Sequence, residues 1–437
     1  MLSIPKQNVR SKISVLGVVQ MISALTILNL LFTILSFFNV PDVEENYDMD
    51  QPMEFGRYRD EKLSIDAIPG APLIILKPEE VFTRLSRKNH HDNHKFETIK
   101  NGIFMSVRTT NKYHKSRLKI LLDTWISEVP ENTWIITDEE DGWLVQYIRD
   151  HFKNAKPHIL NTHCPTTSEH KWALLCKLHW EYRTFLSSNK LWFCHFDDDS
   201  FVNIGMLTNL LSSHSEDDVM YIGRTPSKTP ITAMAYDTEN VEPESFGFNE
   251  TTNETTWVMS QSTFQRVAFH YALGGAGFCI SRQLAVDMKE YALGSRLMHM
   301  AASINLPDDC VFGYIITHQL NVSLITTNLV HTHMENLTLI PKSSLQQQVT
   351  LSYSLPEETR HSEMENISDT KKNVVENAEN SVFFHRNFSD SNVIKPNLTK
   401  PNVVNLNKYF SAKYDPTRFY NLHQLVYIRG GQHVDRV

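Results

Sequence analysis

From about residue 96 onward, apolar runs of strand length alternate with longer stretches whose apolar residues recur at helical spacing. The strand-like runs are residues 101–107, 133–138, 191–196 and 219–223. The helix-like stretches are residues 115–126, 171–186 and 204–211, with Asn203 or a neighbour as the start of the last. This alternation predicts an α/β body with a mostly parallel central sheet. Two polar ranges, 238–266 and 356–404, interrupt the pattern and predict exposed loop insertions.

The N-terminal region contains one long uncharged stretch, residues 13–40, which follows Lys6, Arg10 and Lys12 and precedes a run of acidic residues. A membrane-spanning helix needs roughly 20 apolar residues, and positive charges mark its cytosolic end. We therefore predict a transmembrane signal anchor at 13–40 with residues 1–12 in the cytosol. A cleaved signal peptide is the alternative, but its apolar core would be shorter, about 7–15 residues, and would end in small residues.

Composition agrees with a lumenal location for the rest of the chain. Residues 41–95 are polar and contain several prolines, which predicts a stem that leaves residues 96–437 as the lumenal catalytic domain. The five cysteines fit an oxidising compartment. Seven Asn-x-Ser/Thr sequons begin at Asn249, Asn253, Asn321, Asn336, Asn366, Asn387 and Asn397. The net charge of −8, without a long Lys/Arg cluster, gives no sign of a nucleic-acid partner.

Three consecutive carboxylates, Asp197, Asp198 and Asp199, follow the predicted strand at 191–196. The ends of such strands are where α/β sheets bind ligands, and a cation would relieve the repulsion among the three side chains. Helix capping by aspartate is the alternative interpretation. Carboxylate oxygens suit Mg²⁺ or Mn²⁺, and an added imidazole favours Mn²⁺.

Two later segments carry further candidate chemistry. His331 or His333 could supply the imidazole, although either could be an ordinary core histidine. Asp308 and Asp309 follow Pro307, where a carboxylate could act as general base on an acceptor hydroxyl or simply cap a helix. A metal held by aspartates would suit a sugar-nucleotide transferase, in which it stabilises the leaving diphosphate, but also a hydrolase or polymerase.

Several segments in fixed order resemble the Fringe family of β-1,3-N-acetylglucosaminyltransferases. They are VRTTNKYHKSRLKILLDTWISE, WFCHFDDDSFVN, GGAGFCISRQLA, LPDDCVFGYII, HTHMENL, QQQVTLSY and DPTRF, between about residues 96 and 419. The resemblance implies a GT-A fold and a single-pass type II protein of the Golgi membrane. It also implies transfer of GlcNAc from UDP-GlcNAc to O-linked fucose on EGF-like repeats, such as those of Notch, with Mn²⁺ as cofactor.

The resemblance assigns a role to individual residues. Asp199 and His333 would ligate Mn²⁺, while Asp198 and Arg117 would contact the donor. Asp309 would be the base that deprotonates the fucose 3-hydroxyl for a displacement with inversion. The implied disulfides are Cys164 with Cys176 and Cys194 with Cys279, which leaves Cys310 as a buried free thiol.

The chain departs from the family pattern at two positions near these segments. RTT, beginning at Arg108, replaces the usual KTT, and Leu273 replaces a usual Thr before GGAG. Neither change removes a residue assigned to chemistry. The alternatives are a sister β-1,3-galactosyl- or glucosyltransferase with the same metal site and base, an inactive lumenal lectin-like homologue, and a membrane-anchored metal hydrolase.

Overall fold

The computed structural model describes residues 67–85, 90–165, 170–214, 218–236, 247–249, 254–256, 264–356 and 400–428. The chain divides into two compact units, of which one comprises residues 1–58 and 246–257 and the other the rest. In the smaller unit, the described residues form a hairpin of β10 (Gly247–Asn249) and β11 (Glu254–Thr256). Within the described ranges, no helix is long and apolar enough to cross a membrane. The predicted anchor at 13–40 lies outside these ranges.

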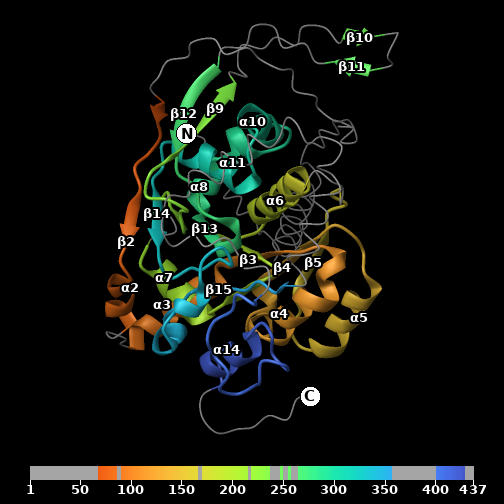
Figure 1. Ribbon diagram of the computed structural model, residues 1–437, viewed down its shortest axis with the longest axis vertical. Coiled ribbons are helices and arrows are strands. Elements are labelled where there is room, and N and C mark those ends of the chain that lie inside the picture. Colours follow the sequence, from red (N-terminus) through yellow and green to blue (C-terminus); the bar gives the residue numbers. More distant parts are fainter. Residues whose placement is uncertain are drawn as a thin grey trace, which may run out of the picture. The chain divides into compact units, whose positions relative to one another are not determined.

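An eight-stranded sheet forms the centre of the larger unit (Figure 1). In spatial order the strands are β2 (Ile74–Leu76), β14 (Leu324–Thr327), β8 (Tyr221–Gly223), β13 (Phe278–Ser281), β6 (Trp192–Asp197), β3 (Ile103–Arg108), β4 (Thr133–Thr137) and β5 (His158–Asn161). Every neighbouring pair is parallel except the two that involve β13. The mixed α/β body with a mostly parallel sheet is therefore confirmed, and this architecture fits a GT-A-like fold.

Two smaller sheets accompany the central one. β1 (Ile68–Pro69), β12 (Phe264–Phe269) and β9 (Ile231–Tyr236) form the first, and β15 (Thr350–Ser352) pairs with β7 (Ser200–Val202) in the second. Because β7 begins directly after the three aspartates, the β15–β7 pair holds the chain that leaves the end of β6.

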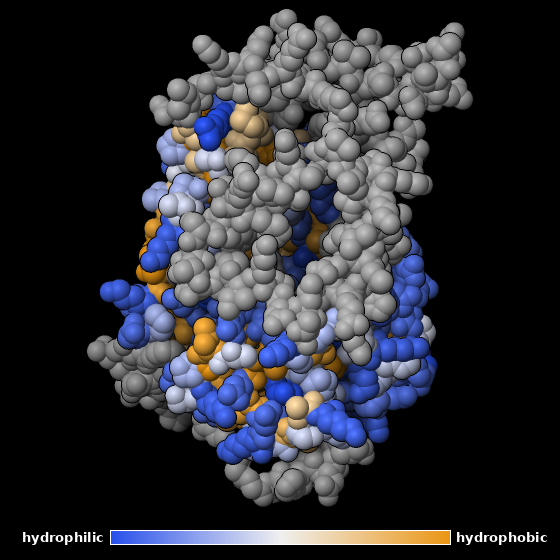
Figure 2. All heavy atoms as spheres, in the orientation of Figure 1, coloured by the Kyte–Doolittle hydropathy of each residue, from blue (hydrophilic) through white to orange (hydrophobic). Residues whose placement is uncertain are grey.

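Helices pack around the central sheet. Two of the three predicted helices are present, as α6 (His170–Ser187), which packs on β3, β4 and β6, and as α7 (Ile204–Ser212). The third, at 115–126, is α-helical only at Lys119–Asp123, between a π-helical turn at His114–Leu118 and a 3₁₀ turn at Trp125–Glu128. Asn203 caps α7, since its side chain accepts a hydrogen bond from Met206 N at 3.2 Å. The remaining α-helices with described bounds are α2 (Pro78–Leu85), α3 (His90–Asn101), α4 (Lys119–Asp123), α5 (Gly142–His151), α8 (Arg282–Asp287), α9 (Lys289–Ala292), α10 (Arg296–Ile304), α11 (Asp308–Tyr314) and α14 (Phe419–Val426). On the right of the view in Figure 2, over α5, the described surface is mainly hydrophilic.

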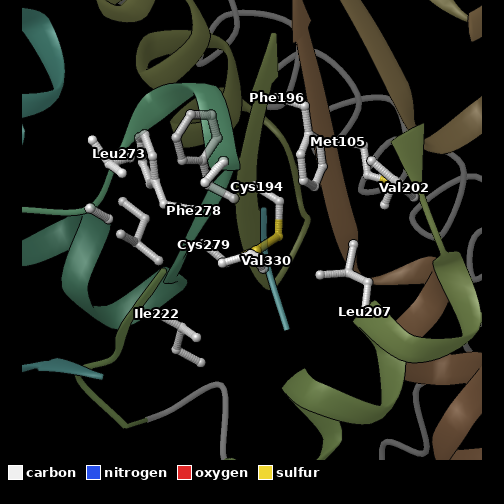
Figure 3. Close-up of a cluster of buried hydrophobic side chains, with 14 of the residues drawn as sticks. Met105, Cys194, Phe196, Val202, Leu207, Ile222, Leu273, Phe278, Cys279 and Val330 are labelled. Atoms are coloured by element: carbon white, nitrogen blue, oxygen red, sulfur yellow. A yellow bond between two sulfur atoms is a disulfide. The ribbon is translucent and has the colours of Figure 1, made fainter. Parts of the chain in front are cut away.

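The core between sheet and helices is apolar and closely packed, and a disulfide crosses it (Figure 3). Cys194 of β6 and Cys279 of β13 are register partners, and their sulfurs form the bond. Aromatic side chains surround this bond, among them Phe196 and Phe278, which are almost completely buried. β13, the antiparallel strand, is thereby tied covalently to the strand that ends in the aspartate cluster.

The predicted boundary between stem and body is too late in the chain. Residues assigned to the stem at 41–95 include β2, which extends the central sheet beside β14, and β1, which pairs with β12. Ala71 and Val81 are buried. These strands are too short and too close to prolines to be recognised as strands from the sequence. Their pairing depends on distant segments rather than on local apolar runs. The described body begins by residue 67.

The predicted insertions are also slightly too long. Residues 264–266 belong to β12, and Val403 and Val404 are buried in the body. Apart from the β10–β11 hairpin and these ends, the two ranges lie outside the described residues.

Candidate active site

The aspartate cluster lies where β3 and β6 end side by side. In this parallel pair Arg108 is the register partner of Asp197. Arg108 Nε and Nη2 lie 3.0 and 2.9 Å from Asp197 Oδ1, and Nη1 donates to Asp308 Oδ2. Burial opposes ionisation of Asp197, but Arg108 and His195 together outweigh it and hold the pKa of Asp197 well below its usual range. The cation that faces the first aspartate is thus an arginine.

The second aspartate faces another arginine. Asp198 Oδ1 accepts a hydrogen bond from Arg117 Nη1 at 3.2 Å, and Oδ2 accepts one from Thr109 Oγ1 at 2.7 Å. The Arg117 guanidinium lies 3.9 Å from the centre of the Tyr113 ring, so the aromatic face supports it. Burial, with a smaller contribution from neighbouring Asp199, raises the pKa of Asp198 to about 6 despite Arg117. The two residues predicted to contact the donor therefore contact each other.

The third aspartate faces a histidine. Asp199 Oδ2 lies 3.3 Å from His333 Nδ1, while Asp199 Oδ1 is buried and has no hydrogen-bond partner among the described residues. An orphaned carboxylate oxygen beside an imidazole is a donor set that fits Mn²⁺. Within the described ranges no group of three or more His, Cys, Asp or Glu side chains could hold a metal. This pair would therefore need further ligands from a bound substrate or water.

The structure separates the two histidines of the HTH segment. His331 is buried, with Nδ1 3.1 Å from Glu335 Oε1 and Nε2 2.9 Å from Gln348 Oε1, and it does not face the aspartates. The side chain of His333 is 37% exposed and points to Asp199. Helix capping does not explain the aspartates, because α7 begins at Ile204 and uses Asn203 as its cap.

The GGAG segment lies close to both His333 and Asp309. A Cβ added to Gly275 would lie 3.3 Å from Thr332 Oγ1 and 3.7 Å from His333 Cε1. A Cβ added to Gly274 would lie 3.7 Å from Asp309 Cβ. We call residues 274–277 the glycine loop. Because its glycines have no side chains, His333 and Asp309 can both approach the backbone of this loop closely.

Asp308 and Asp309 start α11 but face different partners. Asp308 is buried against Arg108. Asp309 is half-buried and accepts hydrogen bonds from Gly274 N at 3.1 Å and from Cys310 N at 2.8 Å. Burial and the adjacent charge of Asp308 raise the pKa of Asp309 to about 6, against the effect of the two backbone N–H groups. Asp309 is therefore a carboxylate to which no cation among the described residues is bonded, and the glycine loop and Cys310 N hold its two oxygens.

Sequence reasoning missed two buried partners of the aspartate cluster. His195 Nδ1 lies 2.6 Å from Glu181 Oε2, and His195 Nε2 lies 3.6 Å from Asp197 Oδ1. Burial alone would lower the pKa of His195, but Glu181 and Asp197 together raise it to about 9. A signal was present in the sequence, since His195 interrupts an otherwise apolar buried strand.

A further residue that sequence reasoning missed, Asn402, holds the loop that carries His333. Asn402 Nδ2 donates to the carbonyls of His333 and Glu335, both at 2.7 Å, and Asn402 Oδ1 accepts from Leu337 N at 3.1 Å. Backbone hydrogen bonds between Asn402 and Ser354 fix its position. The sequence gives no signal for this contact, because Asn402 is 65 to 69 positions away from its three partners in the loop.

Replacing Asn402 by alanine is expected to lower the free energy of unfolding by about 2 kcal/mol, because two carbonyls and one N–H lose their partner. Urea denaturation of the purified protein measures this. Asn405→Ala is the matched control, since Asn405 is exposed three residues away. Equal midpoints for the two variants would show that the Asn402 bonds do not stabilise the loop.

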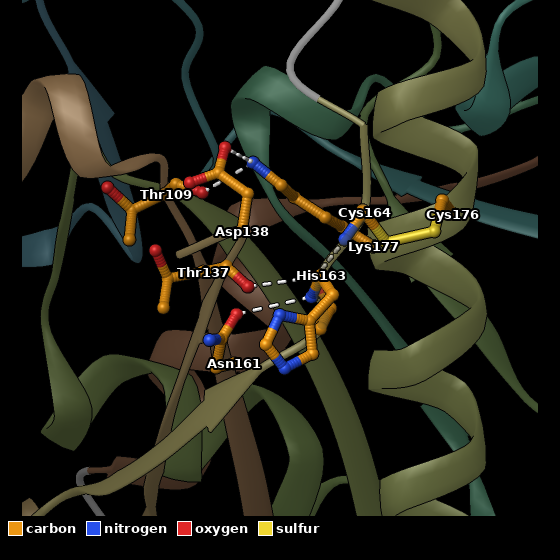
Figure 4. The surroundings of a disulfide bond; sticks show 9 residues. Thr109, Thr137, Asp138, Asn161, His163, Cys164, Cys176 and Lys177 are labelled. Carbon is orange, nitrogen blue, oxygen red and sulfur yellow. Dashed lines mark hydrogen bonds and ion pairs between the residues drawn. A yellow bond between two sulfur atoms is a disulfide. The ribbon is translucent and has the colours of Figure 1, made fainter. Parts of the chain in front are cut away.

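The second disulfide lies beside another buried ion pair (Figure 4). Cys164, which follows β5, is bonded to Cys176 of α6. The neighbouring Lys177 donates to Asp138 Oδ2 and to the carbonyl of Thr109, both at 2.8 Å. The helix thus helps to fix the residue that bonds Asp198. Both disulfides expected from the sequence are present, and Cys310 is a buried free thiol.

Comparison with known proteins identifies the family. The Fringe-like family model matches residues 98–373. The β-1,3-N-acetylglucosaminyltransferase lunatic fringe of Xenopus laevis is 41% identical over 261 residues, or 60% of this chain and 61% of that protein. Lunatic fringe of Danio rerio and radical fringe of Gallus gallus are each 36% identical over 325 residues, or 74% of this chain and 68% of each relative. The match to the Xenopus protein thus spans about three fifths of that protein's length. The chain belongs to the Fringe family.

Proposed function

We propose that the chain is a Mn²⁺-dependent, inverting β-1,3-N-acetylglucosaminyltransferase that moves GlcNAc from UDP-GlcNAc to O-linked fucose on EGF-like repeats, including those of Notch-type proteins. The observation that carries the proposal is the position of Asp309. It adjoins the glycine loop at Gly274, as His333 does at Gly275, and no arginine or lysine among the described residues is bonded to it. The relatives named above are β-1,3-N-acetylglucosaminyltransferases by name.

The aspartate side of the site would hold the donor. Asp199 and His333 would ligate Mn²⁺, which when bound would stabilise the negative charge of the departing diphosphate. Arg117 would lie beside the donor with a fixed positive fork, kept in place by Asp198 and the Tyr113 ring.

Asp309 would act on the acceptor. Its ionised carboxylate would take the proton from the fucose 3-hydroxyl while that oxygen bonds to the anomeric carbon and the bond from this carbon to UDP breaks. The two backbone N–H groups on Asp309 leave each carboxylate oxygen a further lone pair for the incoming proton. A single displacement of this kind inverts the anomeric centre and needs no second nucleophilic carboxylate.

The rate should depend on pH through this base. Asp309 must be deprotonated to act, and its pKa is raised to about 6. We expect kcat/KM for the acceptor to be constant above about pH 7 and to fall roughly tenfold per pH unit below about pH 6. UDP binding, measured by calorimetry at the same pH values, separates this effect from titration of Asp198. If weaker UDP binding at low pH fully accounts for the fall in kcat/KM, the assignment of Asp309 as the base is wrong.

The cellular location follows the same proposal. The uncharged stretch at 13–40 would anchor the protein as a single-pass type II protein of the Golgi membrane, with the catalytic domain in the lumen. Protease treatment of intact Golgi vesicles tests this, because a lumenal domain stays protected until detergent is added. Digestion of the body in intact vesicles would contradict it.

The test of the function compares three donors. The full lumenal body, residues 59–437, is incubated with Mn²⁺, an O-fucosylated EGF repeat and UDP-GlcNAc, UDP-Gal or UDP-Glc, and mass spectrometry identifies the added sugar. We expect an N-acetylhexosamine from UDP-GlcNAc, lost when a chelator is added or fucose is omitted. A hexose instead would indicate the sister galactosyl- or glucosyltransferase. Sugar release without acceptor would indicate a hydrolase, and UDP binding without turnover an inactive homologue.

A further inference from the structure

Charged side chains, buried except for the half-buried Asp197, form a chain of contacts beside the glycine loop. It begins at Glu181 of α6, which contacts His195 of β6 at 2.6 Å. His195 in turn lies 3.6 Å from Asp197. Arg108, at the end of β3, bonds both Asp197 and Asp308, the first residue of α11. The chain therefore joins a helix and two sheet strands to the turn that carries Asp309.

Arg108 is the link between the two acidic motifs. One edge of its guanidinium, Nε and Nη2, reaches Asp197, and Nη1 reaches Asp308, a residue 200 positions away in the sequence. The Arg108 and Asp308 side chains are each 7% exposed, so water hardly screens this contact. A guanidinium is a rigid planar fork, which fixes two carboxylates relative to each other in a way that a flexible ammonium does not.

We propose that Arg108 is a positioning residue that holds Asp309, through Asp308 and the start of α11, at a fixed place relative to the donor-side aspartates 197–199. The inference rests on the proposed function, because only there does Asp309 act as a base on an acceptor. The glycine loop supports it: a Cβ on Gly274 would lie 3.8 Å from Arg108 Nη2 and 3.7 Å from Asp309 Cβ. Arg108 and Asp309 thus both lie close to Gly274.

The consequence for catalysis is geometric. The base must lie within hydrogen-bond reach of the acceptor hydroxyl while the donor's anomeric carbon is held on the aspartate side. A displacement of about 1 Å between two such halves can reduce the rate by about 100-fold without weakening either binding step. Arg108 should therefore act on kcat and leave the donor's KM nearly unchanged.

Three variants test this. Arg108→Met would leave Asp308 as a buried, uncompensated charge and could prevent folding, so it is combined with Asp308→Asn, which removes that charge. We expect this double variant to fold and to bind UDP with Mn²⁺ within about 3-fold of wild type, but with kcat reduced about 100-fold. Arg108→Lys keeps the charge without the fork and should reduce kcat by about 3- to 10-fold. Arg282→Lys is the control, since Arg282 is a half-buried arginine that bonds backbone carbonyls on α6 and the turn after it.

The kinetics of these variants decide whether Arg108 positions Asp309. Normal kcat in the folded double variant, or a loss confined to KM and UDP binding, would overturn the inference. If the double variant does not fold, Arg108→Lys decides: a lower kcat with unchanged KM supports the inference, and a kcat equal to that of Arg282→Lys overturns it. Wild-type protein that transfers no sugar from any donor would instead overturn the proposed function, and this inference with it.

Discussion

Asp309→Asn is expected to reduce kcat by about 10²- to 10⁴-fold, the usual loss when a general base is removed. Asparagine has the same shape, and its one carbonyl oxygen can keep one of the two backbone hydrogen bonds that Asp309 accepts from Gly274 N and Cys310 N. It cannot take a proton from a hydroxyl. Initial rates of transfer at saturating donor and acceptor measure the loss.

UDP binding gives the internal control for this variant. Because Asp309 bonds backbone N–H groups and not Asp199 or His333 within the described residues, affinity for UDP in the presence of Mn²⁺ should change by less than about 2-fold. Asp150→Asn, an exposed aspartate on α5, should have wild-type kinetics. Full turnover in Asp309→Asn would show that another group is the base.

Asp199→Ala should have the second large effect, and on a different quantity. It removes the carboxylate whose buried Oδ1 has no hydrogen-bond partner among the described residues. We expect the Mn²⁺-dependent part of UDP binding to weaken by at least about 100-fold, because even partners beyond the metal ligands typically contribute about 10- to 100-fold. Calorimetric titration with UDP, with and without Mn²⁺, measures this directly.

His333→Ala should reproduce that pattern, since His333 contacts the same carboxylate at 3.3 Å. His331→Ala is the informative comparison. His331 bonds Glu335 and Gln348 instead, so its loss should lower stability more than it changes the response to Mn²⁺. Equal UDP titrations with and without Mn²⁺ in the wild-type protein would refute the metal assignment.

Much of the fold could be predicted from the sequence, because local pattern determines those elements. The strands β3, β4 and β6 are apolar runs, and α6 and α7 have apolar faces and defined starts. The strands β1 and β2 could not be predicted, because they have two or three residues and depend on partners more than 190 positions away. The antiparallel direction of β13 is likewise a property of the pairing rather than of its four residues.

The candidate site shows the same division. Three consecutive aspartates after a strand were visible as an unusual charge cluster, and the family resemblance placed His333 with Asp199 and Arg117 with Asp198, but it did not place Arg108 opposite Asp197. Two of them face arginines and the third a histidine, and this depends on the register of β3 with β6 and on the path of distant loops. Local sequence alone did not distinguish Asp308 from Asp309, and only the family resemblance assigned Asp309 as the base. The first turn of α11 directs one to Arg108 and the other to the glycine loop.

The stereochemistry of the product tests directly whether the chain transfers GlcNAc by a single inverting displacement. UDP-GlcNAc carries an α-linked sugar, so one displacement assisted by a single base must give a β-linked product. The O-fucosylated EGF repeat is glycosylated by the wild-type protein with Mn²⁺, and proton NMR identifies the anomeric configuration and the fucose carbon that is substituted. If Asp309 assists a single displacement, the product is β-linked GlcNAc on O3 of fucose. An α-linked product, or free GlcNAc with unmodified fucose, would contradict it.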